Sequence, residues 1–328
     1  MLAVRSTESG IRAVTVDGPS ESAGPTDPSG PSASGGPGRP RVRLRIAAAG
    51  ICGTDVSFAA MGLRGFTYGH EMAGTTPDGR AWAIEPSLYC GTCAECASGN
   101  VQRCDADGHG VLGVFQDGGM TSEIVVPEYT LLPLPAGLPV EDASLVEPGS
   151  VAWHGVRRAG LVAGERVAVV GGGSIGLLAA ASARRMGFEV DVEARYEHQR
   201  SAADKLGAGR PDGQYDVVID TAGSPTALAR CAELARPGGR VVVVGVYFVT
   251  ASYPGPPSLT KELTYLNAIA YDHRDGRREF ADVAAMLAEQ PEIAEAVITH
   301  RFPLADATEA FRVAADRSAG AIKVVLHP

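Results

Sequence analysis

The sequence lacks the features that mark several large classes of protein. No run of consecutive apolar residues approaches the length of about 18 that a membrane span requires, and the first residues lack the charged-then-apolar layout of a signal peptide. A basic surplus is also missing, because 29 lysines and arginines face 38 acidic residues and leave a net charge of −9. We therefore expect no membrane association, no nucleic-acid partner and a cytoplasmic location.

Two further absences narrow the class of fold. The chain has no internal repeat and no strict glycine period, which excludes collagen, and its 328 residues exceed the size of a disulfide-stapled miniprotein. What it does contain is 45% apolar residues, enough for a sizeable core, and 41 glycines. This length favours two domains. Four of the six cysteines fall between residues 90 and 104, and clustered cysteines in a cytosolic protein are more often metal ligands than disulfides.

The first half of the chain is typical of a β-rich domain. Short β-like stretches at 2–5 and 11–16 precede a segment at 18–40 that consists almost entirely of Gly, Pro, Ser and Ala. That composition cannot bury apolar surface and predicts a surface loop. Residues 41–47 alternate apolar and basic side chains, as in a half-buried strand. From 50 to 148, short β-like runs are broken by Gly and Pro, with no long helical period.

From residue 149 onward, strands alternate with helices. This alternation indicates right-handed βαβ units and therefore a doubly wound parallel sheet of the α/β class. Beyond Tyr271 two amphipathic helices, at 277–288 and 305–316, precede a final strand at 322–326. The expected strands of the parallel sheet are 166–170, 189–193, 216–220 and 240–246, with helices at 174–186, 198–206 and 226–235 and further β character at 263–271.

The cysteine cluster has the spacing C-x2-C-x2-C-x7-C, formed by Cys90, Cys93, Cys96 and Cys104. Four thiolates close a tetrahedral shell around zinc and leave no position for a substrate, so the predicted site is structural. An iron–sulfur cluster also uses closely spaced cysteines, but its usual run is C-x2-C-x2-C-x3-C-P. Zinc is therefore the expected metal.

A second group of residues offers an open metal site. Cys52, His70, Glu71 and Glu147 together supply a thiolate, an imidazole and carboxylates. Such a set can hold zinc while one position stays open for water or substrate. Each residue alone is weak support, because a single histidine or buried cysteine is more often structural.

Residues 167–176 read as a strand, a G-x-G-x-x-G turn and the start of a helix. Gly171 permits the turn, Gly173 allows the backbone to approach a pyrophosphate, and Gly176 allows the helix to pack closely on the strand. Ser174 and Ile175 open that helix, whose free N–H groups and positive dipole end attract phosphates. The strand and helix on either side supply the context that this otherwise weak motif requires.

The end of the next strand bears on the choice of cofactor. NAD-binding proteins place an acidic residue there for the ribose 2′-hydroxyl. Counting from Gly187 puts Ala194 at this position, followed by Arg195, and Arg200 can add a second charge. A missing carboxylate beside an arginine favours a 2′-phosphate, so NADP is the expected cofactor. A shift of one residue would restore an acid, Glu193, and leave NAD open.

Taken together, these motifs resemble the zinc-dependent medium-chain dehydrogenase/reductase family of alcohol and polyol dehydrogenases. The resemblance also includes Asp117-Gly118-Gly119, Glu147-Pro148 and the closing Gly-Ala-Ile-Lys-Val-Val of 320–325, and it covers nearly the whole chain. Glu147 stands where alcohol dehydrogenases have a cysteine. In this feature the chain resembles the sorbitol, threonine and glucose dehydrogenase branch. A zinc-free quinone reductase of the same superfamily conflicts with the two metal-ligand sets.

The resemblance implies a GroES-like, β-rich catalytic domain at 1–148 and 273–328, with a Rossmann cofactor domain at 149–272 inserted in it. It implies two zinc ions per chain, the catalytic one held by Cys52 and His70 with Glu71 or Glu147. Thr54 would relay the substrate proton, and hydride would pass between NAD(P) and a secondary alcohol or ketone, such as a polyol, sugar or cyclitol. The family also suggests a homodimer or homotetramer.

Some features leave the expected pattern or stay undecided. The hairpin at 75–80 is tight where relatives have a longer loop, and the glycine-rich segment 207–215 stands where relatives have another strand and helix. That shortening motivates an alternative: a non-catalytic nucleotide-binding or redox-sensing relative that retains only the structural zinc. Lys323 could approach the cleft or be solvated, and His273 has no partner that the sequence identifies.

Overall fold

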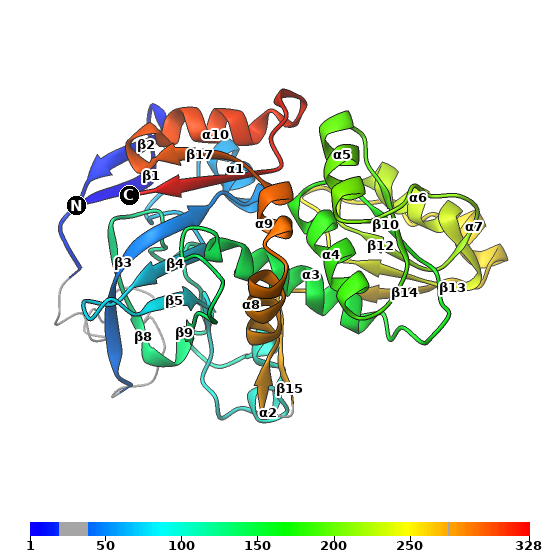
Figure 1. The fold of residues 1–328 in the computed structure, drawn as a ribbon, viewed down its shortest axis with the longest axis horizontal. Helices are drawn as coiled ribbons and strands as arrows, with labels where there is room; N and C mark the ends of the chain where they lie inside the picture. The colour runs from blue at the N-terminus through cyan, green and yellow to red at the C-terminus, as the bar shows by residue number, and fades with distance from the viewer. Residues whose placement is uncertain (20–38, 275) are drawn as a thin grey trace. The chain divides into compact units, whose positions relative to one another are not determined.

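The computed structural model describes residues 1–19, 39–274 and 276–328, so most of the loop predicted at 18–40 lies outside the described residues (Figure 1). These residues form two compact units. The first comprises Met1–Glu147, Asp272–Pro291 and Ile298–Pro328, and the second Pro148–Tyr271 and Glu292–Val297. The boundary at Glu147 falls in the first turn of α3 (Val146–Arg158).

The first unit is built on a seven-stranded sheet with the order β17-β18-β3-β4-β5-β9, in which β8 also pairs with β3. All its pairs are antiparallel except β17 with β18. The closing strand, β18, therefore joins the C-terminal segment to β3 in one sheet, while β1 and β2 pair in a separate sheet. Its strands are β3 (Arg41–Gly50), β4 (Glu71–Thr75), β5 (Ala81–Ile84), β8 (Glu123–Pro127), β9 (Leu131–Pro133), β17 (Ile298–Pro303) and β18 (Lys323–His327).

The core of this unit lies between the sheet and two helices, α1 (Gly53–Ala60) and α10 (Ala307–Ala315). α10 packs against α1, β18 and the hairpin of β1 (Leu2–Thr7) and β2 (Gly10–Thr15). The α1 helix was not predicted, because only eight residues form it and its apolar positions show no sustained helical period. It matters for the site, since Cys52 is its N-cap residue.

A small lobe carries the cysteine cluster, and a short hairpin lies beside it. The lobe contains β6 (Ser87–Leu88), α2 (Ala94–Ala97), η1 (Val101–Arg103) and β7 (Gly110–Val111). The hairpin of β15 (His273–Arg274) and β16 (Arg277–Arg278) leads into α8 (Glu279–Glu289). The unit is completed by short 3-10 turns: η2 (Glu128–Thr130), η3 (Ala143–Leu145), η4 (Leu304–Asp306) and η5 (Arg317–Ala319).

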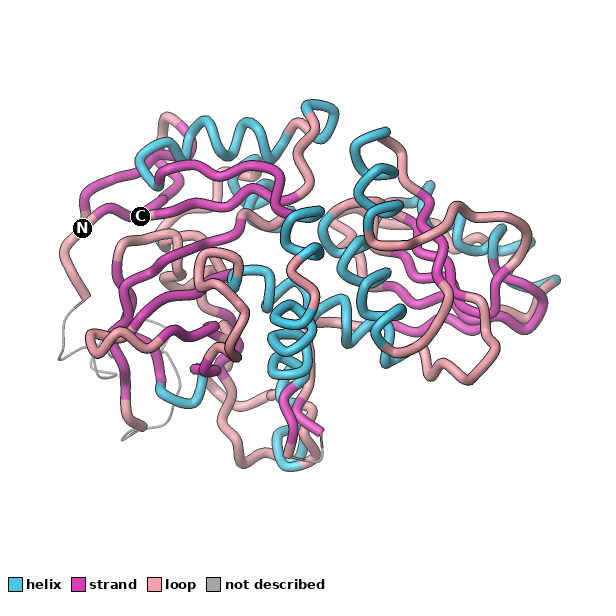
Figure 2. Tube along the Cα trace, in the orientation of Figure 1, coloured by secondary structure: helices cyan, strands magenta, loops and turns pink. Residues whose placement is uncertain are grey.

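The second unit is a five-stranded parallel sheet with the order β11-β10-β12-β13-β14, which confirms the predicted doubly wound α/β fold. α4 and α5 lie on one side of the strands and α6 and α7 on the other (Figures 1 and 2). The strands are β10 (Val167–Val170), β11 (Val190–Glu193), β12 (Tyr215–Asp220), β13 (Ala235–Val243) and β14 (Thr264–Asn267). The helices are α4 (Ser174–Arg185), α5 (Glu197–Lys205), α6 (Pro225–Leu234), α7 (Gly255–Thr260) and α9 (Glu292–Val297), of which α9 packs on α4 and α5.

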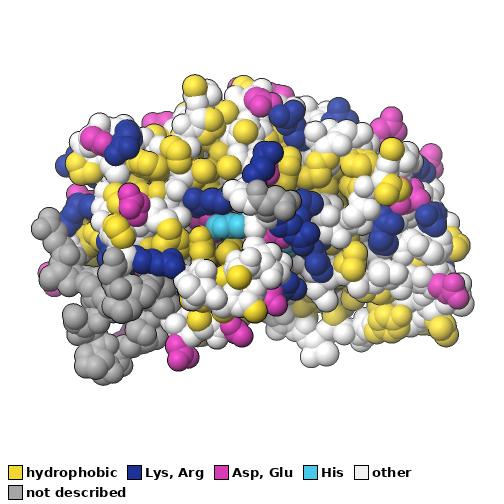
Figure 3. Space-filling model, turned by 90° about the horizontal axis from the view of Figure 1, so that it is seen from below, with side chains coloured by type: hydrophobic (Ala, Val, Ile, Leu, Met, Phe, Trp, Pro, Cys, Tyr) yellow, Lys and Arg dark blue, Asp and Glu magenta, His cyan; other side chains and the backbone are white. Residues whose placement is uncertain are grey.

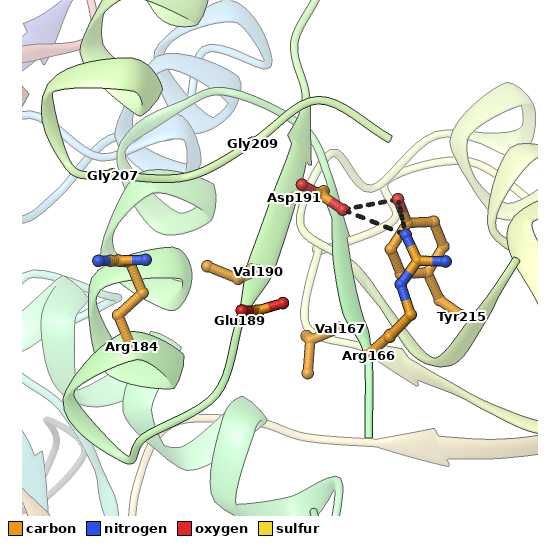
Figure 4. A pocket seen from close by; sticks show the side chains of 9 residues that line it. All are labelled: Arg166, Val167, Arg184, Glu189, Val190, Asp191, Gly207, Gly209 and Tyr215. Carbon is orange, nitrogen blue, oxygen red and sulfur yellow. Dashed lines mark hydrogen bonds and ion pairs between the residues drawn. The ribbon is translucent and has the colours of Figure 1, made fainter. Parts of the chain in front are cut away.

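The shortened segment 207–215 leaves β11 at the edge of this sheet. Gly209 makes a single parallel bridge to Asp191, so one residue stands where a further strand would pair. A cavity of about 250 Å³ lies beside it. On its wall the Tyr215 hydroxyl donates to Asp191 at 2.7 Å, and the Arg166 guanidinium lies over the Tyr215 ring (Figure 4). The edge is therefore held by side chains where backbone pairing is missing.

The surface carries charges of both signs. On the face shown in Figure 3, Lys and Arg side chains occur among Asp and Glu side chains, with apolar groups between them. Among the described residues, no helix is long and apolar enough to cross a membrane.

Candidate functional site

The four cysteines of the lobe converge as a metal site requires. Their sulfur atoms all lie within 4.8 Å of one another, and the Cys90 and Cys96 sulfurs are 3.9 Å apart. Sulfurs around a tetrahedral zinc are about 3.8 Å apart, given Zn–S bonds of about 2.3 Å. Cys93 caps α2, and Cys104 follows η1, so two short helical turns aim their sulfurs at the others.

Backbone amides around the cluster point at sulfur. The amides of Thr92 and Cys93 donate to the Cys90 sulfur at 3.3 and 3.2 Å. These hydrogen bonds favour the thiolate and lower the pKa of Cys90 to about 6. Thiolates are the form that binds metal, so the donor set fits a closed zinc site.

A buried charge network anchors the hairpin beside the lobe. Glu85, wholly buried, accepts hydrogen bonds from His273 Nε2 at 3.0 Å and from Arg278. The His273 amide also donates to the Gly99 carbonyl of the lobe at 2.7 Å. Sequence patterns could not identify this network, because Glu85 lies 188 residues from His273 and 193 from Arg278.

The second candidate centre forms where β3 ends and β4 begins. Gly50 pairs with Glu71 in the register of these strands, which brings Cys52 beside His70. The ligand atoms of Cys52, His70 and Glu71 lie within 4.8 Å of one another. Gly69, with a φ of 101°, makes the turn that a side chain would strain just before His70. Three of the four predicted ligands therefore converge.

Asp55 orients both Cys52 and His70. One of its carboxylate oxygens accepts the Cys52 amide at 2.9 Å, and the other lies 3.6 Å from His70 Nδ1. Within the described part of the chain, neither His70 Nδ1 nor this second oxygen forms a hydrogen bond. Burial alone lowers the pKa of His70, but the charges of Asp55 and Cys52 raise it well above its usual value. A carboxylate behind one ring nitrogen, with the other nitrogen near a thiol, is the arrangement that supports metal-binding histidines.

The two carboxylates of the centre have different surroundings. Glu71 accepts hydrogen bonds from Lys323 Nζ on both oxygens, each at 2.6 Å, and both side chains are buried. Lys323 is therefore not solvated. Glu147 is also buried, and that burial raises its pKa to about 7. It lies near enough to His70, Glu71 and Lys323 for their charges to act on its pKa. The convergent thiol, imidazole and carboxylate of Cys52, His70 and Glu71, with the Glu147 carboxylate nearby, fit zinc.

Thr54, the candidate proton relay, lies half-buried in the first turn of α1, two residues after Cys52. Phe58, one turn further along the helix, packs its ring against Phe115 with centroids 5.4 Å apart. Phe115 has a φ of 63°, uncommon for an aromatic residue, and is 62% exposed. An exposed aromatic ring held in strained backbone thus lies near the helix that begins at the metal centre.

The glycine turn has the geometry of a phosphate-binding loop. Gly171 has a φ of 121°, and a Cβ at Gly176 would collide with the Gly171 carbonyl. At Gly173 a Cβ would meet nothing within 4 Å. Packing therefore explains Gly176, whereas the open space at Gly173 would allow a cofactor pyrophosphate to approach the protein backbone closely. Ser174 and Ile175 form the first turn of α4.

The residues after β11 surround the predicted 2′ position. Ala194 lies against the turn, because a Cβ at Gly172 would come within 2.5 Å of the Ala194 Cβ. Arg200 donates to the carbonyls of Ala194 and Arg195 and pairs with Glu197, so it fixes this backbone. The Arg195 guanidinium lies 5.4 Å from the Tyr196 ring centre.

Sequence comparison with known proteins identifies the family of this chain. The chain is 33% identical over 299 residues to L-galactonate-5-dehydrogenase of Escherichia coli K12, spanning 82% of this chain and 86% of that one. The chain belongs to the zinc-dependent medium-chain dehydrogenase/reductase family. Residues 38–136 of this medium-chain dehydrogenase match the alcohol dehydrogenase GroES-like domain, and residues 188–326 match the zinc-binding dehydrogenase domain. It is an NAD(P)-linked alcohol or polyol dehydrogenase.

Solved structures agree with this medium-chain dehydrogenase over its whole length. Galactitol-1-phosphate dehydrogenase from Escherichia coli superposes with a TM-score of 0.85 at 25% identity, covering 100% of both chains. A protein described as a zinc-binding dehydrogenase from Sinorhizobium meliloti 1021, bound to NADP, has a TM-score of 0.80 at 26% identity, covering 100% of this chain and 99% of that one. Both the GroES-like unit and the Rossmann-type unit therefore have counterparts in these solved structures.

Proposed function

We propose that this medium-chain dehydrogenase transfers hydride between NADP and a secondary alcohol or ketone of a polyol, sugar or cyclitol. The observation that carries the proposal is the convergence of the Cys52, His70 and Glu71 ligand atoms within 4.8 Å at a centre separate from the four-cysteine lobe, where His70 and Glu71 are buried and Cys52 is partly buried. Four cysteines fill the coordination shell of a zinc and leave it a structural role. Three ligands of the Cys-His-carboxylate type leave one coordination position open for a substrate, as catalysis requires. This second centre argues against a relative that keeps only the structural zinc.

Each residue of the centre has a distinct role in the proposal. Zinc, when bound, supplies a Lewis acid that polarises the substrate oxygen and lowers the pKa of its hydroxyl. Cys52 and His70 would hold the metal, with Asp55 fixing the orientation of both. Thr54 would accept the proton of the substrate hydroxyl and pass it towards solvent.

The two carboxylates would divide the remaining work. Lys323 occupies both oxygens of Glu71, so Glu71 serves as a charge beside the centre. Glu147, a second buried carboxylate on whose pKa the charges of His70 and Glu71 act, is then the carboxylate available as a third ligand. Cys90, Cys93, Cys96 and Cys104 would hold the second zinc of each chain and fix the lobe.

The cofactor would lie across the glycine turn, with its pyrophosphate over Gly173 and at the start of α4. An alanine at position 194 and an arginine at 195 support NADP over NAD, because neither repels a 2′-phosphate. The Sinorhizobium meliloti relative bound to NADP is in keeping with this preference.

The names of the relatives bear on the substrate class, and one edge of the parallel sheet bears on assembly. The relatives are named as dehydrogenases of L-galactonate and of galactitol 1-phosphate, which supports a polyhydroxylated substrate. β14 is an edge strand with the exposed Ile269 just beyond it, and an edge of this kind supports pairing with a second copy in a homodimer or homotetramer. A cytoplasmic location accords with the reduced cysteines.

The deciding experiment compares two cysteine variants of the purified chain. A panel of polyols, sugars and ketones is assayed with NADP and NAD, and zinc is counted by elemental analysis. We expect Cys52→Ser to lose one of two zincs and nearly all activity. Cys231→Ser, which alters a buried cysteine in α6 of the other unit, should keep both zincs and most activity. Activity that survives in Cys52→Ser refutes the proposed centre, and one zinc in the parent chain with no activity supports the non-catalytic alternative.

A further inference from the structure

The last residue of β11 is an acid, although the chain is proposed to bind NADP. Glu193 pairs with Val170 in the sheet register, and its carbonyl accepts the amide of Gly171 at 3.0 Å. It is therefore next to the glycine turn and directly precedes Ala194, the residue at the predicted 2′ position. A free carboxylate so near a 2′-phosphate would repel it and would favour the ribose 2′-hydroxyl of NAD.

This carboxylate is not free. Arg230, in α6, donates from Nε to both Glu193 oxygens, at 3.0 and 2.8 Å. Its Nη1 also donates to Glu233 at 3.0 Å, which fixes the guanidinium from the other side. The Glu193 and Arg230 side chains are 36% and 40% exposed, so the pair lies at the surface, where its charge can act on a bound cofactor.

The other two arginines near Glu193, Arg195 and Arg200, make different contacts. Arg200 is occupied by the carbonyls of Ala194 and Arg195 and by Glu197. Arg195, whose guanidinium lies near the Tyr196 ring, is the arginine that would pair with a 2′-phosphate. Neither of them contacts Glu193 among the interactions of the described residues, so Arg230 is the arginine there that pairs with that acid.

We propose that Arg230 is a specificity-determining residue. By pairing with Glu193 it offsets a negative charge near Ala194 that would otherwise favour a ribose 2′-hydroxyl over a 2′-phosphate. The inference rests on the proposed binding of NADP. Arg230 acts here as a positioning residue, since it works through Glu193 and needs no contact with the cofactor.

The test measures binding, not turnover, and uses two fragments of the cofactor. Affinities of the whole protein for adenosine 2′,5′-bisphosphate and for AMP are measured by calorimetry, and their ratio reports recognition of the 2′-phosphate alone. Arg230→Met should lower this ratio about 3- to 10-fold, as expected for one uncompensated and partly screened charge. Glu193→Gln alone should leave the ratio within about 2-fold of the parent chain's.

The double variant Glu193→Gln/Arg230→Met separates charge from structure. If Arg230 acts by masking Glu193, the double variant regains the parent ratio; a merely structural Arg230 gives no such rescue. Arg236→Met, which removes an ion pair with Asp216 elsewhere in the same unit, serves as the matched control and should not change the ratio. An unchanged ratio in Arg230→Met, or no rescue in the double variant, overturns the inference.

The same measurements keep this inference apart from the proposed cofactor. A parent chain that binds AMP as well as the bisphosphate refutes the NADP preference. The effect of Arg230 is judged from the changes between variants, whatever the parent ratio.

Discussion

The Lys323 ammonium lies 2.6 Å from each carboxylate oxygen of Glu71, with both side chains at most 2% exposed. The same nitrogen donates to the Ile51 carbonyl at 3.0 Å. One buried lysine from β18 thus fixes the first residue of β4 and the backbone just before Cys52. Although burial by itself lowers the pKa of Lys323, the charge of Glu71 raises it above its usual value, so the pair stays ionised.

Removing Lys323 is expected to be costly. Lys323→Met leaves the Glu71 carboxylate buried and unpaired, which should lower the free energy of unfolding by about 3–5 kcal/mol. Denaturant unfolding in excess zinc measures this loss. Glu71→Gln/Lys323→Met should recover a large part of it, and Lys205→Met, at an exposed lysine of α5, should change little. Equal stability of Lys323→Met and the parent chain would show that the ion pair has no net effect.

The glycine turn offers a matched pair of substitutions. Gly173→Ala places its Cβ in open space, so the protein should keep its melting temperature but bind NADP at least about 10-fold more weakly. Gly176→Ala drives a Cβ into the Gly171 carbonyl, so it should lower the melting temperature as well. Thermal unfolding and cofactor fluorescence distinguish the two. The explanation is wrong if Gly173→Ala binds NADP normally.

The cysteine lobe should depend on its metal for stability but not for chemistry. Cys96→Ser is expected to lose one zinc and to expose the lobe to protease cleavage, since four thiolates fix a segment with few buried side chains. Zinc in the other centre should remain. Limited proteolysis with elemental analysis tests this, with Cys231→Ser as the control. A resistant lobe in Cys96→Ser would mean that backbone contacts suffice to hold it.

Phe115 should contribute to substrate binding. Its exposed ring packs on Phe58, one helical turn from Thr54, a distance of about 6 Å along the helix. Phe115→Ala is expected to raise KM about 3- to 10-fold for a polyol substrate with a smaller change in kcat, because an aromatic face binds without taking part in proton or hydride transfer. Leu259→Ala, which truncates an exposed residue of α7, should leave both constants unchanged. A fall in kcat alone would contradict this role.

The sequence predicts the strands of the cofactor unit and three of its helices because each of these features is local, but it does not predict α3, α7 or α9. The strands of consecutive valines, the Gly171–Gly176 turn and the alternation with helices all depend on neighbouring residues. Its strand ends at Val170 and Asp220 coincide with the structure. The short α1 escaped prediction because eight residues carry too little periodicity, and its start at Cys52 depends on the hydrogen bond of Asp55.

Pairings between distant residues are what the sequence could not reveal. Lys323 finds Glu71 across 252 residues, and His273 finds Glu85 across 188. Nothing near either residue indicates whether it faces solvent or a buried acid. The same holds for Arg230, whose position in a surface helix gave no sign that it masks Glu193.

The position of β18 between β17 and β3 bears on how the chain matures. During synthesis, the whole of Pro148–Tyr271 emerges before residues 323–327 do, so the nucleotide-binding unit can fold first. The metal-binding unit cannot be completed until then, because the end of β3 pairs only with β4 and Glu71 lacks its lysine. A chain that ends before residue 323 would thus have a folded nucleotide-binding unit and an incomplete metal-binding unit, a species that chaperones are expected to recognise.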